Sequence, residues 1–366
     1  MILDNNGIIQ KSKDARREYG QAKENEQADL NKVSEWIEKQ ANGDGETKVN
    51  PTVPGWENKK EDNATINGGE GNANNPTIPA GYVPINTDTS NWGDGNSTPT
   101  QDSVDHGLVI KDESNNEWVW IPVPDVTVMC DTANQTEYTL YGTTGNTAVT
   151  TNRYSKTITI GKDSNTKTMS RTTPGATSSY REPDLVIGSD STSYDAKEEY
   201  YKTILGFASK EKMAEAFVAD YNEMIASVSK YGGFYIGRYE LSSAGVQKDK
   251  PVLSRENWYI LYKRCKKLNA SNKVETRMIW GCQWDVTCNF IANKGDQKDI
   301  IDSSSWGNYK GTSVKADDGT TVLKRSGTDY NLNTGATTFT MANNIYDLAG
   351  NCYEWTQEAI GPKYPR

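Results

Sequence analysis

The sequence predicts an α+β protein made of an N-terminal helix, a flexible linker and a C-terminal domain. Three observations support this prediction. Apolar residues recur at helical spacing within the charged run of residues 1–41. Residues 42–105 are rich in Asn, Gly, Pro and Thr and have no hydrophobic period, which is typical of a linker. Strand-like alternation and helical stripes then follow one another through residues 106–366.

The overall composition limits the classes of function. The chain has 366 residues, enough for two domains, but only 34% are hydrophobic, so much of it must be linker or exposed loop. The net charge of −9 argues against a nucleic-acid groove or an anionic membrane surface. One histidine, His106, leaves neither a Ser-His-Asp triad nor a multi-histidine metal site. No apolar run reaches the roughly 18 residues of a transmembrane helix, and no signal peptide is visible.

The five cysteines predict neither a disulfide framework nor a zinc site. They are scattered, with no C-x-x-C pair, so buried thiols are expected. Cys265 belongs to a helical core stripe, and Cys282 and Cys288 lie six residues apart, which is not one face of a helix. The cysteines are Cys130, Cys265, Cys282, Cys288 and Cys352.

The N-terminal segment, residues 1–41, predicts one amphipathic helix or two joined pieces. Its apolar stripe is thin, and the other positions are mostly Lys, Arg, Glu, Asp and Gln. Such a helix is marginal in isolation and needs a partner. Within the linker, residues 79–84 are expected to lay a short extended strand against the C-terminal domain.

The C-terminal domain is expected to open with two strands around a turn at residues 112–116. In the second strand Trp118 and Trp120 share one face, and Val119 and Ile121 share the other. Because both faces are apolar, this strand is predicted to be buried on two sides. A Thr- and Ser-rich insertion follows over about 126–194, and it contains a possible hairpin.

Two helices and a strand are predicted in the middle of this domain. The first helix begins at the N-cap Ser209, carries an apolar stripe and ends at Gly232. An alternating strand follows, in which Arg238 and Glu240 are expected to form an ion pair. Ser254 is the expected cap of the second helix. Further along, residues 313–323 predict a hairpin about an Asp-Asp-Gly turn.

The stretch Asn-Asn-Ile-Tyr-Asp-Leu-Ala-Gly-Asn-Cys-Tyr-Glu-Trp-Thr, residues 343–356, is the most specific motif of the chain. Its Gly350-Asn351 pair indicates a tight turn. Asn and Glu side chains with nearby carbonyls are oxygen donors of the kind that Ca²⁺ prefers. The alternative interpretation of the stretch is an aromatic strand that follows a turn.

This stretch resembles the signature of the formylglycine-generating-enzyme (sulfatase-modifying factor) family, which has a C-type-lectin-like fold. The segment from Phe234, with Arg277 and Trp284, resembles further family landmarks. The resemblance implies a domain with little regular secondary structure. It also implies a structural Ca²⁺, held by the side chains of Asn351 and Glu354 and the backbone carbonyl of Cys352.

The resemblance also suggests an oxidase activity. Enzymes of this family convert a substrate cysteine to formylglycine and use a copper-binding cysteine pair in an Arg-Gly-Gly-rich segment after the signature. Copper(I) requires soft thiolates. No such segment occurs before Arg366, so the domain is expected to be truncated at its C-terminus and to be non-catalytic. The alternative is a formylglycine-generating oxidase whose catalytic segment is missing from this sequence.

Residues 4–11 resemble the segment that follows the membrane half of the first helix in type IV pilin-like proteins of Gram-positive bacteria. The resemblance implies a surface-displayed binding head, either an adhesin or a minor pilin-like subunit. It predicts an extracellular or cell-surface location, pilus-like assembly through the N-terminal helix, a protein or carbohydrate ligand, and no nucleic-acid partner. The alternative is a solvated charged helix with no targeting role.

Overall fold

The computed structural model of the chain describes residues 52–66, 68–87, 89, 91–92, 100–130, 135–141, 149–154, 156–171, 180–181, 199–268, 274–357, 359–360 and 364–365. The helix expected over residues 1–41 lies outside this range. Helices and small antiparallel sheets occur together, which confirms the α+β class. Among the described residues, no helix is both long and apolar enough to cross a bilayer.

Helices and strands are intermixed along the chain rather than grouped into a helical part and a strand part. The helical elements are α2 (Gln101–Asp105), η1 (Val126–Val128), η2 (Glu199–Ile204), α3 (Lys210–Tyr231), α4 (Trp258–Cys265), α5 (Gly281–Asn293), η3 (Ser303–Ser305) and η4 (Thr338–Thr340). The strands are β1 (Val83–Ile85), β2 (Val109–Lys111), β3 (Glu117–Pro122), β4 (Gln135–Tyr141), β5 (Val149–Tyr154), β6 (Lys156–Lys162), β7 (Asn165–Arg171), β8 (Tyr180–Arg181), β9 (Gly233–Gly237), β10 (Val314–Lys315), β11 (Val322–Lys324), β12 (Met341–Ala342), β13 (Ile345–Tyr346), β14 (Ala359–Ile360) and β15 (Tyr364–Pro365).

An antiparallel sheet in the order β1-β2-β3-β9 forms the centre of the domain. The predicted hairpin of β2 and β3 is confirmed, with Val109 opposite Val119. Successive side chains of β3 point to opposite faces and enter two separate hydrophobic clusters. Val119 and Ile121 pack with the helices, whereas Trp120 packs with the segment before β2. The prediction that this strand is buried on both sides is therefore confirmed.

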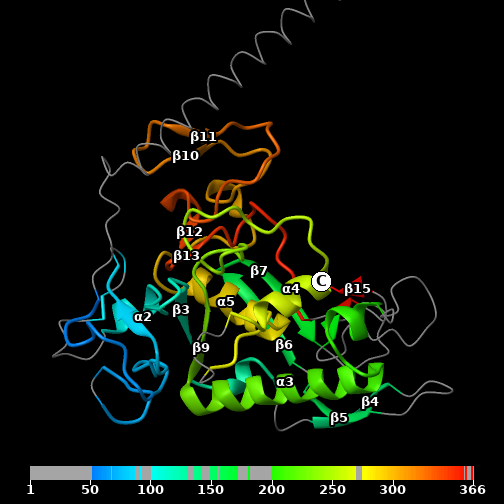
Figure 1. The fold of residues 1–366 in the computed structure, drawn as a ribbon. Coiled ribbons are helices and arrows are strands. Elements are labelled where there is room, and N and C mark those ends of the chain that lie inside the picture. The colour runs from blue at the N-terminus through cyan, green and yellow to red at the C-terminus, as the bar shows by residue number, and fades with distance from the viewer. Residues whose placement is uncertain are drawn as a thin grey trace, which may run out of the picture.

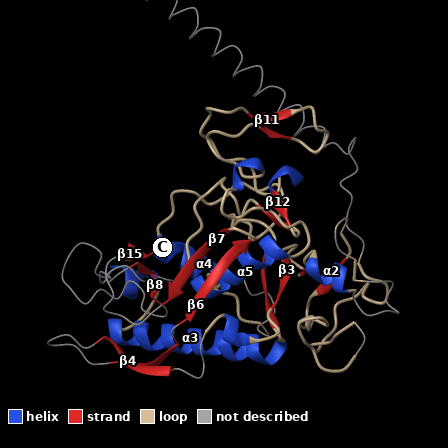
Figure 2. Cartoon of the chain, turned by 180° about the vertical axis from the view of Figure 1, so that it is seen from behind, coloured by secondary structure: helices blue, strands red, loops and turns tan. Residues whose placement is uncertain are grey.

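Helix α3 has the boundaries that the sequence predicts. The Ser209 side chain accepts a hydrogen bond from Lys212 N, and Gly232 ends the helix with a φ of +74°. Its apolar stripe, which includes Met213, Phe217 and Val228, is buried in the main core. In Figures 1 and 2, α3 lies at the opposite end of the domain from the β10–β11 hairpin.

The segment of residues 52–92, here called the arm, differs from the predicted linker. Its residues Val53, Ile78 and Trp92 are fully buried. The Trp92 indole N–H donates to Val109 O at 3.1 Å, and β1 pairs with β2, as expected for the extended strand at residues 79–84. The composition suggested a linker because the arm has few apolar residues, but most of those it has are buried in the domain. Residues 52–92 are therefore part of the domain.

Two local predictions were wrong. Asn257, rather than Ser254, caps α4, because its side chain accepts from Ile260 N at 3.0 Å. Arg238 pairs with Glu117, at 2.6 Å, and not with Glu240. Strand pairing brings Glu117 next to Arg238, and sequence spacing alone does not reveal that neighbour.

Both further hairpins are confirmed, whereas the expectation of buried thiols holds for Cys130, Cys282 and Cys288 but not for Cys265 and Cys352, which are partly exposed. The hairpin within the insertion is confirmed as β6–β7, and the hairpin after residue 313 as β10–β11. Strand β6 of the insertion packs against α5. Cys282 and Cys288 are both buried within α5. The five cysteines all lie in the described part of the chain and form no disulfide there.

Candidate functional site

Residues 343–356 form a junction, here called the hub, that connects segments far apart in the sequence. Asn343, Asn344, Asp347 and Asn351 all have positive φ values, between 47° and 65°. Asn and Asp tolerate this left-handed region better than other side chains do. The spacing of these residues along the hub therefore favours an irregular backbone path, interrupted by the two-residue strand β13.

The first two asparagines join the hub to α5 and to the arm. The Asn343 amide accepts from Asp296 N at 2.8 Å and donates to Lys294 O at 3.1 Å, just beyond the end of α5. The Asn344 amide donates to Gly107 O at 2.8 Å and accepts from Thr89 Oγ1 at 2.8 Å. Buried amides with these partners hold the connecting loops in place.

Asp347 and Gly350 join the hub to the loops on its other side. Asp347 accepts from Gly335 N at 2.7 Å and from Thr340 Oγ1 at 2.7 Å. Gly350 has a φ of +86°, and a Cβ there would lie 2.6 Å from Asn308 O. The close approach of the Asn308 backbone therefore requires glycine at this position of the signature.

Asn351 lies in the middle of a chain of hydrogen bonds that runs from a buried lysine to a buried glutamate. Lys324, 3% exposed, donates to Asn308 Oδ1 at 2.5 Å, and Asn308 Nδ2 donates to Asn351 Oδ1 at 2.8 Å. Asn351 Nδ2 in turn donates to Glu240 Oε2 at 2.5 Å. Asn351 Oδ1 also accepts from Leu332 N at 2.8 Å. Both acceptor positions of the Asn351 amide oxygen are thus occupied.

Burial raises the pKa of three carboxyl groups around the hub, those of Glu240, Asp347 and Glu354. For Glu240 and Glu354 the pKa lies well above the ordinary value, because burial disfavours the charged form and neighbouring carboxylates add to the effect. Among the described residues, Glu354 Oε1 has no hydrogen-bond partner. Burial and the nearby Glu240 also raise the pKa of the Cys352 thiol.

Of the three residues predicted to bind Ca²⁺, Asn351 and Cys352 form hydrogen bonds within the protein. Asn351 Oδ1 already accepts from two N–H groups, and Cys352 N donates to Glu240 Oε1 at 3.1 Å. Within the described parts of the chain, no group of three or more His, Cys, Asp or Glu residues could hold a metal ion. The arrangement of Asn351 does not fit an inner-sphere calcium ligand, and calcium stays a prediction.

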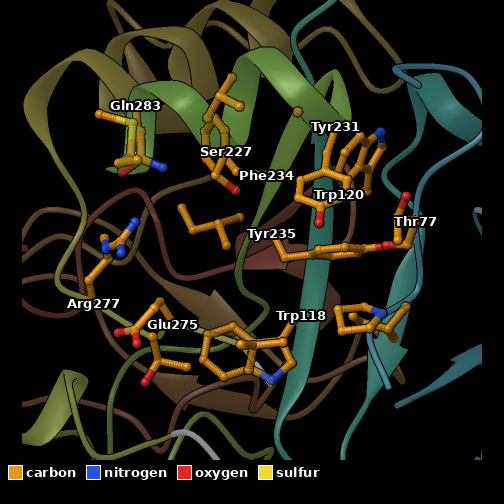
Figure 3. Close-up of a pocket in the computed structure, with 18 of the residues that line it drawn as sticks. Thr77, Trp118, Trp120, Ser227, Tyr231, Phe234, Tyr235, Glu275, Arg277 and Gln283 are labelled. Carbon is orange, nitrogen blue, oxygen red and sulfur yellow. The ribbon is translucent and has the colours of Figure 1, made fainter. Parts of the chain in front are cut away.

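A cavity of about 420 Å³ lies between β3, β9, α3, the arm and residues 274–283. None of the hub residues lines it. In Figure 3, Trp118, Trp120 and Tyr235 lie on one side, and Arg277 and Gln283 lie on the opposite side. We call this cavity the aromatic pocket. Its volume is within the range of about 300–1,000 Å³ that is typical of small-molecule sites.

The aromatic side of this pocket comes from the central sheet. In the β3–β9 register, Trp120 is opposite Tyr235 and Trp118 is opposite Gly237. The rings of Trp120 and Tyr235 have centroids 4.9 Å apart, and the Tyr235 hydroxyl donates to Thr77 O at 3.1 Å. The Trp120 indole donates to Ala73 O at 2.9 Å, so the arm fixes this aromatic side.

The polar side is organised by Asp220 of α3. Arg277 Nε donates to Asp220 Oδ1 at 3.1 Å, and Lys266 Nζ lies 2.8 Å from the same oxygen. Arg277 Nη2 is 3.9 Å from Glu223, and Lys266 is 3.4 Å from Glu275. Each of the two cations is paired with a carboxylate, and the three carboxylates leave one negative charge in excess, so the polar side carries mixed donors and acceptors without a free cation.

Sequence reasoning identified the hub but missed the aromatic pocket. It placed Trp118 and Trp120 correctly on one face of a strand but assigned that face to the core. The signal that pointed to a site was the content of ten Trp and twenty Tyr, because such residues combine apolar area with a polar group. The opposing residues, Arg277 among them, come from segments whose proximity depends on the fold.

Comparison of the chain with protein-family models, with curated proteins and with solved structures finds no match.

Proposed function

We propose that this domain is a non-catalytic binding head whose ligand occupies the aromatic pocket. The observation that carries the proposal is the arrangement of the pocket, where aromatic rings on one side face polar side chains on the other. Concave sites with mainly apolar walls and a few convergent polar groups are the usual places for small ligands. The lectin-like relationship suggested by the signature, in which loops on a rigid core serve recognition, supports the same proposal.

The side chains around the pocket favour binding over catalysis. Among the described residues that line it there is no His, Cys or Asp, and its two glutamates, Glu223 and Glu275, are largely exposed. General acid–base or nucleophilic catalysis needs a reactive group held in position by a partner. The lining residues offer hydrogen bonds and aromatic contact instead.

Display on a bacterial surface is the second part of the proposal. It rests on the resemblance of residues 4–11 to pilin-like proteins, and it assigns the protein to an adhesin or a minor pilin-like subunit. The domain would then be the ligand-binding end of a displayed assembly. The proposed ligand is a protein or a carbohydrate of the surface to which it attaches.

A binding assay with two variants of α3 tests the pocket. Ser227 lines the pocket and Ser229 does not, although both are exposed on the same helix. Labelled wild-type protein, Ser227→Trp and Ser229→Trp would be applied to immobilised mucin, peptidoglycan, extracellular matrix and epithelial cells. Retention of wild type and Ser229→Trp on one of these surfaces, with loss of Ser227→Trp, is expected. Equal retention of the two variants contradicts the proposal.

The alternative, a formylglycine-generating oxidase, is distinguished by its product. Incubation of the protein with copper, oxygen and a cysteine-containing peptide is expected to leave the peptide mass unchanged. Formation of formylglycine would establish the alternative. Titration calorimetry with CaCl₂ tests the calcium prediction separately, and heat that is absent in Glu354→Gln would support it.

A further inference from the structure

We propose that the ligand of the aromatic pocket is a neutral saccharide, which stacks on Trp118 and forms hydrogen bonds with the side that carries Arg277. This inference rests on the proposed binding function and specifies the chemical class of the ligand. It follows from the shape of the aromatic side, the pairing of both cations on the polar side with carboxylates, and the volume of the pocket.

The aromatic side offers a ring that is available for stacking. Trp120 is covered by Tyr235, its neighbour on β9, whereas the β9 neighbour of Trp118 is Gly237, which has no side chain; on β2 the neighbour of Trp118 is Ile110. The Trp118 indole lies at the pocket (Figure 3). Aromatic faces carry partial negative charge, so they attract the weakly positive C–H groups on the face of a sugar ring.

The polar side suits the hydroxyl groups at the edge of such a ring. Arg277 supplies N–H donors, Glu275 supplies acceptors, and Ser227 supplies a hydroxyl that does both. Arg277 is held in place by Asp220 and is only 12% exposed. A preorganised guanidinium loses less freedom on binding than a surface side chain does. Hydroxyls, which donate and accept, match this mixture of groups.

The charges around the pocket argue against an anionic ligand. Arg277 is paired with Asp220 and lies near Glu223, so no uncompensated cation is available for a phosphate or carboxylate. Glu275 and Asp220 both face Lys266, and the one negative charge in excess lies on the glutamates Glu223 and Glu275, which are largely exposed and therefore screened by solvent. A wholly apolar ligand would leave the polar side without hydrogen bonds.

The volume of about 420 Å³ is toward the lower end of the range for small-molecule pockets and suits one or two sugar rings. The arm contributes to this limit, because Thr77 and Pro79 close the side next to Tyr235. None of the contacts uses Asn351, Cys352 or Glu354. Saccharide binding is therefore expected to be unaffected by chelation of calcium.

The experiment uses the full chain and a panel of probes. Saturation-transfer-difference NMR would be recorded with cellobiose, lactose, maltose and N,N′-diacetylchitobiose, and with choline and phenyl phosphate as ionic probes. At least one disaccharide is expected to bind, with the strongest signals from its ring C–H protons. Titration calorimetry is expected to show affinity at least about tenfold weaker in Trp118→Ala and Ser227→Trp. Ser229→Trp and addition of EDTA are expected to leave the affinity unchanged.

Several outcomes would overturn the proposal, and they differ in what they imply for the binding function. If no disaccharide binds although Ser227→Trp abolishes surface retention, the binding function stands and the saccharide class is wrong. Binding of choline or phenyl phosphate that displaces the disaccharides would also reject a neutral ligand. If a disaccharide binds equally to Ser227→Trp and Ser229→Trp, saccharide binding does not use this pocket. Ser227→Trp adds a side chain to an exposed position, so its folding does not depend on the loss of core contacts.

Discussion

At the scale of single residues, the hub depends on short polar side chains that each perform two tasks. Asn351 adopts a left-handed backbone conformation with φ of +60°, and its amide also connects Asn308, Leu332 and Glu240. An isolated left-handed asparagine in a turn performs only the first task. The difference in stability lost when each of these two asparagines is replaced therefore measures the contribution of the hydrogen-bond network.

Replacement of Asn351 by Ala is expected to destabilise the domain by about 2–4 kcal/mol, because it leaves buried partners without hydrogen bonds and strains the backbone. Asn115 is the matched control, since it has a similar φ of +63° in an exposed turn. Asn115→Ala is expected to cost only about 1 kcal/mol. Urea denaturation measures both values, and equal losses would contradict a role for the network.

The carboxyl group of Glu354 predicts a dependence of stability on pH. Its pKa is raised in the folded state, so the folded protein retains a proton that the unfolded chain loses, and stability falls as the pH rises above the ordinary carboxyl range. Glu354→Gln cannot ionise. The substitution is expected to leave the melting temperature almost unchanged at about pH 4 and to raise it at about pH 8. A difference in melting temperature that is the same at both pH values would contradict this explanation.

At the scale of secondary-structure elements, helix ends and hairpins follow local sequence closely. Helix α3 starts and stops where its capping residues predict, and the β2–β3, β6–β7 and β10–β11 hairpins form as the turn sequences indicate. The end of α3 also has a tertiary role. Gly232 lies against the arm, where an added Cβ would be 2.5 Å from Ala73 N.

Gly232→Ala is expected to cost about 2–3 kcal/mol, because it combines an unfavourable positive φ with a clash against the arm backbone. Gly206 is the control, since it has a similar φ of +85° and open space around its Cβ position. Gly206→Ala is expected to cost about 1 kcal/mol. Thermal denaturation compares them, and equal effects would show that the arm does not restrict this position.

At the scale of the whole domain, the arm completes the structure around the central sheet. It covers the Trp120 side of β3, while the helices cover the Val119 side. The same packing forms one end of the aromatic pocket, since the Trp120 indole and the Tyr235 hydroxyl both donate to arm carbonyls. The aromatic pocket therefore depends on a segment whose composition predicts a linker.

Trp92→Ala is expected to destabilise the domain by about 3–5 kcal/mol, because the side chain is fully buried and its indole donates to Val109 O. Tyr353→Ala removes an aromatic side chain that is 95% exposed, and it is expected to change stability by less than about 0.5 kcal/mol. Chemical denaturation followed by far-UV circular dichroism gives both values. No loss of stability in Trp92→Ala would mean that the arm is a linker after all.

Features that depend on neighbouring residues could be predicted from the sequence. These are the caps of α3, the alternation of β3, the hairpin turns and the tight turn at Gly350-Asn351. Three features depend on the three-dimensional packing instead: the pairing of Glu117 with Arg238, the burial of the arm, and the meeting of Arg277 and Trp118 at one pocket. The two groups differ in the sequence separation of the residues that interact, because local backbone preferences are encoded within a few residues. Partners across the fold are selected by the packing of segments far apart in the chain.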